Sequence, residues 1–344
     1  MGRRMKIFVI GDYRTGTGPA NVTLEYLKRL PRGTRHLVAK SKALRAVEIL
    51  LKMPSCDVVL FSGYSKQNIL GLKLAHKLKK PTAYLMHGCV EHENAINECI
   101  DKEMNRVERM TMELSDRIYA VSSQFAKWLR TNYPEYSDKI EAMPNGVNTE
   151  LLKDVLDIDK IQARDSLQIF TIGGGMPRKK IKHICEAIAK INRRYGEMTY
   201  RLVVVGDKGK DDDIINAYPF VENLGLVDFE KTKQLYRESA LFVQNSCFET
   251  FGLAPMEALM CGCNVLLSRE IGALELFNNV EDGDIINNFY DEAEIASKID
   301  RLLKVGNASR LIRAFDRESA SWEKRTVQLQ KKLVQLVMDY RKRK

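Results

Sequence analysis

The sequence predicts an α/β protein with two doubly wound parallel-sheet domains that face one another across a cleft. Short segments rich in Ile, Val and Phe alternate with segments that carry apolar residues at helical spacing, from one end of the 344 residues to the other. Such alternation is typical of parallel sheets covered by helices on both faces. The pattern begins twice, before and after a turn-rich and charged segment at residues 144–163, and this indicates two domains.

In the first half, each expected strand is a cluster of β-branched and aromatic residues, and each expected helix has one apolar side. The strands are expected at residues 6–10, 36–39, 57–61, 82–86 and 117–121. The helices are expected at residues 19–30, 43–53, 67–78 and 98–114. A further helix should begin at Ser122 or Ser123, since a hydroxyl side chain favours the N-cap position.

The second half repeats the alternation, and two of its strands end in glycine. Strands are expected at residues 167–172, followed by Gly173, Gly174 and Gly175, at 200–205, followed by Gly206, and at 241–244 and 264–267. Helices are expected at residues 181–193, 229–236 and 253–260, with a long basic helix at 322–344. The domains should be residues 1–146 and 147–321, with the helix 322–344 packed on the first domain.

Composition restricts the class of protein. Apolar residues make up 44% of the chain, but no run of 18 exists, so we expect no membrane-spanning helix. The apolar run near the N-terminus is too short for a signal peptide. The seven cysteines are scattered and lack paired metal spacing, which favours reduced thiols and a cytoplasmic location.

The net charge of +10 is concentrated in residues 1–80, which hold 17 Lys and Arg against 4 Asp and Glu. Such a basic region attracts nucleic acid, anionic lipid or a phosphorylated substrate. Nucleic acid is disfavoured, because the sequence has no aromatic RNA-binding stripe and no zinc pattern. Residues 40–53 combine apolar and basic residues at helical spacing. This segment is either an ordinary helix packed on the sheet or a helix that lies on an anionic membrane.

The segment from Asn245 to Gly262 has the strongest chemical pattern. A strand should end near Gln244, and Pro255 should lie in the first turn of the next helix, where its missing N–H costs nothing. The amides of Gly252, Leu253 and Ala254 would then form an anion site at the helix N-terminus. Glu257, expected in the first turn, could accept hydrogen bonds from two ribose hydroxyls, while Glu249 lies on the preceding loop.

Glu249 and Glu257 are separated by seven residues, and the surrounding FETFGLAPMEALMCG resembles the signature of glycosyltransferase family 4. Members are retaining enzymes with the GT-B fold, two Rossmann-like domains, and the resemblance is to the bacterial surface-polysaccharide type. Further matches occur in the family's order along the chain. They are Gly16-Thr-Gly18-Pro19, His87-Gly88, Pro144-Asn145-Gly146-Val147-Asn148 and the helix that begins after Ser321.

The resemblance implies a role for each matching position. His87 and Glu249 would contact the donor sugar, Arg178 and Lys179 would neutralise the diphosphate, and Glu257 would hold the ribose. The implied donor-binding positions are Gly16, Gly18, Gly206, Phe251, Gly252, Leu253, Ala254 and Glu257. The family commonly has an arginine just after the strand expected at residues 167–172, and that position falls at or near Gly173. Arg178 or Lys182 could take its place, which leaves the identity of the diphosphate-binding cation open.

We therefore expect a retaining transferase that moves a hexose from a nucleotide-diphosphate sugar, with UDP favoured, to a glycan or lipid-linked glycan. It should need no metal or other cofactor, and residues 1–80 could hold it on the cytoplasmic face of a membrane. The residues 211–213 contain a D-x-D pattern, but we expect an exposed loop there. Alternatives are a transferase that makes a soluble glycoside or glucan, and a non-catalytic basic protein that binds nucleic acid or membrane.

Overall fold

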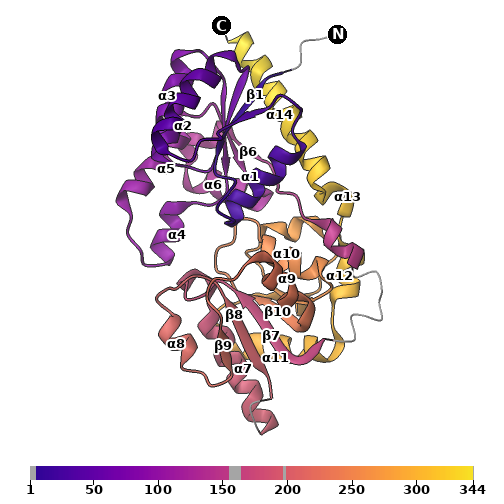
Figure 1. The fold of residues 1–344 in the computed structure, drawn as a ribbon. Coiled ribbons are helices and arrows are strands. Elements are labelled where there is room, and N and C mark those ends of the chain that lie inside the picture. Colours follow the sequence, from indigo (N-terminus) through magenta and orange to yellow (C-terminus); the bar gives the residue numbers. More distant parts are fainter. Residues whose placement is uncertain (1–4, 155–163, 197–198, 344) are drawn as a thin grey trace. The chain divides into compact units, whose positions relative to one another are not determined.

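Two compact units make up the chain, and each is built around a parallel six-stranded sheet (Figure 1). The computed structural model describes residues 5–154, 164–196 and 199–343. The first unit comprises Met1–Asn94, Ile100–Gly146 and Glu318–Lys344, and the second comprises Ala95–Cys99 and Val147–Arg317. Helical segments alternate with the strands in both units, which confirms the predicted α/β class.

The first sheet has the strand order β2-β1-β3-β4-β5-β6, and every neighbouring pair is parallel. Its strands are β1 (Ile7–Gly11), β2 (Arg35–His36), β3 (Val58–Ser62), β4 (Thr82–Met86), β5 (Arg117–Ala120) and β6 (Ile140–Ala142). The order reverses between β1 and β3. Doubly wound sheets bind ligands beyond the carboxyl ends of the strands at such a reversal.

The helices in the first part of the chain largely follow the predicted ranges, apart from α4, which was not predicted. They are α1 (Gly18–Arg29), α2 (Lys42–Lys52), α3 (Lys66–Lys77), α4 (Val90–Ile96), α5 (Lys102–Leu114) and α6 (Ser123–Asn132). The N-cap of α6 is Ser122, whose hydroxyl accepts a hydrogen bond from the amide of Phe125 at 3.0 Å. This agrees with the expectation that a serine starts this helix.

The helix predicted over residues 98–114 corresponds to α5 but was placed four residues too early, since α5 begins at Lys102, and α4 was not predicted. Glu98 has φ 53°, a left-handed conformation that interrupts a helix. Asp101 then caps α5 by accepting a hydrogen bond from the amide of Met104 at 2.9 Å. Apolar residues continue at helical spacing before Lys102, so periodicity alone could not show where α5 begins.

The second sheet has the strand order β12-β11-β10-β7-β8-β9, again with parallel neighbours. Its strands are β7 (Asp165–Ile172), β8 (Arg201–Val205), β9 (Val221–Asn223), β10 (Ser239–Gln244), β11 (Asn264–Ser268) and β12 (Ile285–Ile286). This is the Rossmann order, with its reversal between β7 and β10. The residues of these strands that face the helices form a core that includes Ile169, Val204, Leu241 and Leu266.

The helices of the second half are α7 (Ile181–Tyr195), α8 (Asp212–Asn216), α9 (Phe229–Glu238), α10 (Leu253–Met260), α11 (Glu292–Val305) and α12 (Ala308–Ala314). The expected exposed loop at residues 211–213 is wrong, since α8 begins there. Asp211 is only 5% exposed and lies 3.2 Å from Nζ of Lys182. No group of three or more potential metal ligands exists among the described residues.

The chain ends in α13 (Arg317–Ala320) and α14 (Trp322–Lys342), and α14 packs along α1 in the first unit (Figure 1). Trp322 is 4% exposed and meets Tyr26 edge to face at 5.3 Å between ring centres. Among the apolar residues of α14, Leu329, Leu333, Leu336 and Val337 are buried, whereas Val327 is exposed. Across the described ranges, no helix combines the length and the hydropathy that a membrane crossing requires.

Candidate active site

Glu249 lies in the loop between β10 and α10, beside the reversal of the second sheet. Its Oε2 lies 2.5 Å from Nζ of Lys179 and 3.6 Å from Nη1 of Arg178. Gln244 and Ser246 also donate hydrogen bonds to Oε2, both at 3.4 Å. Burial favours the neutral carboxyl, but the two cations outweigh it and hold the pKa of Glu249 below its usual value. The side chain is therefore ionised at neutral pH.

Arg178 and Lys179 belong to a short turn, Pro177–Lys179, directly before α7. Their side chains are only 16% and 12% exposed. Nη1 of Arg178 donates to the carbonyl of Phe248 at 3.2 Å, and the amide of Cys247 donates to the carbonyl of Arg178 at 2.9 Å. These bonds fasten the turn to the loop after β10. Two positive charges are therefore held at fixed positions beside Glu249.

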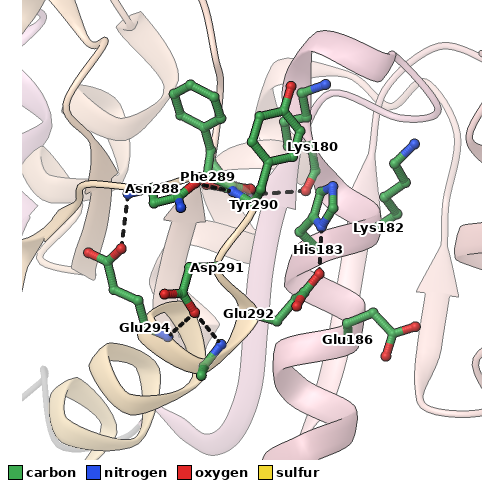
Figure 2. Close-up of polar contacts among 12 residues, drawn as sticks. Lys180, Lys182, His183, Glu186, Asn288, Phe289, Tyr290, Asp291, Glu292 and Glu294 are labelled. Atoms are coloured by element: carbon green, nitrogen blue, oxygen red, sulfur yellow. Dashed lines mark hydrogen bonds and ion pairs between the residues drawn. The ribbon is translucent and has the colours of Figure 1, made fainter.

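Lys180 completes this turn in a left-handed conformation with φ 51°. Nδ2 of Asn245 donates to the carbonyls of Lys180 and Phe289, at 3.3 Å and 3.0 Å. Figure 2 shows Tyr290 beside the turn, and Nζ of Lys180 lies 4.8 Å from the centre of the Tyr290 ring. The segment just before α11 thus supports the turn that holds Arg178 and Lys179.

The N-terminus of α10 begins with Gly252, which has φ 92°. A Cβ at this position would lie 2.8 Å from Cγ2 of Ile271, so glycine is required both by the backbone angle and by the space. Glycine carries no side chain that could cap the helix. The first amides of α10, at Gly252, Leu253 and Ala254, therefore form a positive helix end suited to an anion.

Glu257 lies in the second turn of α10, so its predicted place in the first turn is wrong. The helix begins at Leu253 as predicted, so Glu257 is its fifth residue and lies beyond a first turn of about 3.6 residues. The hydroxyl of Tyr236 donates to Oε2 of Glu257 at 3.5 Å. Burial raises the pKa of Glu257 to about 7, and this hydrogen bond offsets only part of the effect. Phe251 is 2% exposed, so its side chain belongs to the core.

The glycines after β7 and β8 pack backbone against backbone. A Cβ at Gly174 would collide with the carbonyl oxygen of Asp207, and one at Gly206 would collide with the amide nitrogen of Gly174. A Cβ at Gly173 would collide with the side chain of Lys179. No side chain fits at these positions, which explains why an arginine is absent there. The cations nearest to Glu249 are Arg178 and Lys179 instead.

The remaining predicted residues belong to the first unit. Gly16, with φ 75°, lies in the loop after β1, and Gly18 is the first residue of α1. Neither would bring a Cβ within 4 Å of another atom, so the backbone is accessible there. His87 follows β4, and its Nε2 lies 2.9 Å from Oγ of Ser62, the last residue of β3. Burial lowers the pKa of His87 to about 4, so the ring is neutral at pH 7.

Both halves of the chain match models of sugar-transferring families. Residues 5–151 match the model described as Glycosyltransferase Family 4, and residues 156–318 match Glycosyl transferases group 1. This chain is a glycosyltransferase. The D-inositol 3-phosphate glycosyltransferase of Acidothermus cellulolyticus is 24% identical over 326 residues, which cover 87% of this chain and 71% of the relative. The O-antigen chain mannosyltransferase B of Escherichia coli is 28% identical over 170 residues, 46% of this chain and 43% of the relative.

Solved structures show the fold of the glycosyltransferase. Anabaena Alr3699/HepE in complex with UDP and glucose has a TM-score of 0.68 at 14% identity, covering 96% of this chain and all of that chain. Sucrose-phosphate synthase from Thermosynechococcus elongatus has a TM-score of 0.65 at 17% identity, covering 98% of this chain and all of that chain. The two-domain, Rossmann-like GT-B fold expected from the sequence is confirmed.

Within the second unit, the structure of the glycosyltransferase gathers Arg178, Lys179 and Glu249 into one cluster, whereas His87 belongs to the first unit. Sequence reasoning missed Gln244 and Ser246, which donate to Glu249. The sequence signal that could have identified these two residues is the run of polar residues at the end of β10, beside the reversal of strand order. Sequence reasoning also missed Tyr236, the hydrogen-bond partner of Glu257, which lies on a different helix and 21 positions away.

Proposed function

We propose that this glycosyltransferase moves a hexose, with retention of anomeric configuration, from a nucleoside-diphosphate sugar to a glycan or lipid-linked glycan. The observation that carries this proposal is the cluster in the second unit. Lys179 and Arg178 lie beside the ionised Glu249, and the uncapped N-terminus of α10 follows on the same loop. Positive charge and free amides suit a diphosphate, and a buried carboxylate suits sugar hydroxyls.

Each group of the donor would then have a partner in this unit. The amides of Gly252–Ala254, with Lys179 and Arg178, would stabilise the charge that develops on the diphosphate as it leaves. Glu249 would bind the sugar and Glu257 the ribose. We propose front-face attack by the acceptor hydroxyl, with a phosphate oxygen as the proton acceptor. The charges supplied by the protein make a metal unnecessary in this proposal.

The donor is proposed to be a UDP-sugar. Support comes from related folds, since the Anabaena HepE structures contain UDP, UDP with glucose, or UDP-glucose. The backbone of Gly206 would border the base. The first unit would contribute His87 to the sugar, and Gly16 and Gly18 to close backbone approach.

The acceptor is proposed to be lipid-linked and used in surface polysaccharide synthesis, with the enzyme peripheral on an anionic membrane. We define the α2 surface as Leu44, Val47, Leu50 and Leu51, which are 60%, 48%, 58% and 73% exposed. Four large exposed apolar side chains on an 11-residue helix are unusual, and Lys42 and Arg45 lie on the same helix. The E. coli relative that acts on an O-antigen chain adds support.

A soluble phosphorylated acceptor is the second candidate. The basic excess of residues 1–80 would attract it as well as a lipid phosphate. The names of two similar proteins, D-inositol 3-phosphate glycosyltransferase and sucrose-phosphate synthase, favour this reading. Acceptors of the two kinds differ in whether vesicles change the rate of transfer.

A donor panel tests the proposal directly. UDP-, GDP- and ADP-hexoses would be incubated with the enzyme, with lipid-linked and soluble phosphorylated acceptors in parallel, and nucleoside diphosphate release would be measured with and without EDTA. We expect turnover with one UDP-sugar that persists in EDTA, and an α-linked product from an α-linked donor by NMR. Full activity in Glu257→Ala, or an inverted product, would contradict the proposal.

A further inference from the structure

A chain of three short hydrogen bonds runs from α1 through β3 to His87 in the first unit. The hydroxyl of Thr23 on α1 donates to the carbonyl of Pro19 at 2.9 Å. Oγ1 of Thr23 lies 2.7 Å from Oγ of Ser62, which in turn lies 2.9 Å from Nε2 of His87. Thr23 and Ser62 are 2% and 6% exposed, so water does not substitute for these partners.

The number of hydrogens in this chain fixes the direction of every bond. A carbonyl only accepts, so the single hydroxyl hydrogen of Thr23 is used on Pro19. Oγ1 of Thr23 must then accept, and Ser62 must donate its own hydrogen to it. Ser62 has no second hydrogen, so its oxygen can only accept from Nε2 of His87. All three bonds form together only when Nε2 of His87 carries the proton.

The position of Ser62 depends on the neighbouring strand. A Cβ at Gly11, the last residue of β1, would lie 2.7 Å from the carbonyl oxygen of Ser62 and 2.8 Å from its Cβ. Glycine at this point lets β1 and β3 approach at the reversal of the first sheet. The serine hydroxyl is therefore held between α1 and β4 by the fold and not by a flexible loop.

We propose that Thr23 and Ser62 are positioning residues that fix His87 as the neutral tautomer with its proton on Nε2. Nδ1 is then the only acceptor atom of the ring, and it carries a lone pair at every pH where the ring is neutral. A ring in this state recognises a hydrogen donor such as a sugar hydroxyl, and repels a phosphate or carboxylate oxygen. The proposal about the tautomer uses residues of the first unit alone. The effect of the tautomer on sugar transfer, in contrast, rests on the proposed function.

The low pKa of His87, about 4, agrees with a neutral ring over the working pH range. Protonation at Nδ1 would not break the bond to Ser62, so burial, which disfavours the charged ring, is what keeps Nδ1 unprotonated. The hydroxyl chain then decides which of the two neutral tautomers is present. Burial and hydrogen bonding thus have separate roles at this residue.

The tautomer can be read directly by NMR of the full-length protein labelled with ¹⁵N in its five histidines. Long-range ¹⁵N–¹H correlations distinguish a protonated from an unprotonated ring nitrogen, and His87→Asn identifies the His87 signals. We expect an unprotonated Nδ1 and a protonated Nε2 from pH 6 to pH 8. A ring that is mainly protonated on Nδ1 in the wild-type protein would overturn the proposal.

Variants of Thr23 test whether the series of hydrogen bonds sets the tautomer of His87. In Thr23→Val, Ser62 loses its acceptor and can donate to Nε2, so His87 should shift toward the tautomer protonated on Nδ1. We expect kcat to fall about tenfold with little change in donor KM, because one hydrogen bond to the sugar is lost. Thr23→Ser keeps the hydroxyl and should retain both the wild-type tautomer and the wild-type kcat.

Thr111→Val is the matched control, because Thr111 is fully buried and donates to the carbonyl of Val107 at 2.8 Å on α5. It should lower the melting temperature as Thr23→Val does, but leave the tautomer and kcat unchanged. A fall in kcat in Thr23→Val without a tautomer shift would refute the claim that Thr23 acts through the tautomer of His87. A normal kcat in His87→Asn would instead refute the proposed role of His87 in transfer, and would leave the NMR result standing.

Discussion

The decisive interactions at the residue scale are those of two glutamates in one loop-helix segment. Glu249 lies beside Lys179 and Arg178, and its carboxyl group is ionised. Glu257 has a tyrosine hydroxyl as its polar partner, and burial raises its pKa to about 7. Two carboxyls eight positions apart thus differ in charge because one lies beside cations and the other does not.

Replacing Lys179 by methionine should lower kcat by about 10²- to 10³-fold, because the positive charge beside the leaving diphosphate is lost. Steady-state kinetics with the best donor would measure this effect. Lys190→Met is the matched control, since Lys190 lies on α7 and pairs with Glu292 at 3.3 Å. Equal activity of the two variants would show that Lys179 does not stabilise the transition state.

Replacing Glu257 by glutamine should change how stability depends on pH. The pKa of Glu257 is about 7 in the folded protein and near 4.5 when unfolded, so between these values only the folded state holds the proton. Stability is therefore lost as pH rises from about 5 to 8, by up to about 3 kcal/mol at this residue. Urea unfolding at several pH values should show this loss in the wild type and not in Glu257→Gln.

Nucleotide binding should also depend on the ionisation of Glu257, but its trend with pH should be opposite to that of stability. Ribose hydroxyls donate to a carboxylate, so UDP binding should become tighter as pH rises through about 7, and this trend should be absent in Glu257→Gln. Isothermal titration calorimetry in two buffers would detect the released proton. Glu222→Gln, at an exposed residue of β9, should behave as the wild type.

At the scale of elements, the site depends on turns that are fixed by neighbouring segments. The turn Pro177–Lys179 is bonded to the loop after β10 and supported by the segment before α11. Nδ1 of His183 on α7 lies 2.9 Å from Oε1 of Glu292 on α11, which ties these two helices together (Figure 2). Rigid support of this kind is what preorganised charge stabilisation requires.

The α2 surface gives the element-scale prediction. Leu44→Gln combined with Leu51→Gln removes two exposed leucines but keeps good helix formers, and Ile49 still anchors α2 in the core. Binding to phosphatidylserine vesicles should weaken at least about tenfold, since each leucine contributes roughly 1.5–3 kcal/mol when buried in lipid. Flotation assays at two salt concentrations would measure it.

Val305→Gln is the control for this experiment, because Val305 is 68% exposed and lies in the second unit. It should bind vesicles as the wild type does, with the same weakening at high salt. If the wild type does not float with anionic vesicles at low salt, the α2 surface does not bind membranes and the soluble acceptor is favoured.

At the scale of the whole molecule, each unit is a doubly wound sheet with one reversal of strand order. Of the predicted site residues, Gly16 follows β1, and Arg178 and Glu249 follow β7 and β10, whereas His87 follows β4 and Gly206 follows β8. The residues at the reversals themselves are Gly11 and Ser62, which end β1 and β3, and Gly173 and Asn245, which follow β7 and β10. The C-terminal α14 belongs to the first unit, although the second unit precedes it in the sequence. Its anchor Trp322 packs on Tyr26 and fills the space beside Gly146.

Replacing Trp322 by alanine should therefore destabilise the first unit selectively, by about 3–5 kcal/mol. The chain has two tryptophans, Trp128 and Trp322, and both lie in the first unit. Fluorescence of the remaining Trp128 should report an earlier unfolding transition, while calorimetry should show a second transition at its wild-type temperature. A uniform shift of both transitions would contradict independent units.

The sequence by itself determined what depends on local pattern. Alternating strands and helices follow from apolar periodicity, and α10 was placed at its observed bounds by the loop and the proline around Gly252. The spacing of Glu249 and Glu257 and their resemblance to a known signature indicated the chemistry. The start of α5 was placed four residues too early and α4 was missed, because the left-handed Glu98 has no sequence signal of the kind that glycine gives.

Only the tertiary structure decided what depends on contacts between distant segments. Lys179 meets Glu249 across 70 positions, and Thr23, Ser62 and His87 come from three elements that the sheet brings together. The close backbone packing of Gly174 on Asp207 excludes an arginine there, a steric fact that no local pattern contains. Periodicity records which side of an element is buried, but partners are set by strand order, and strand order is non-local.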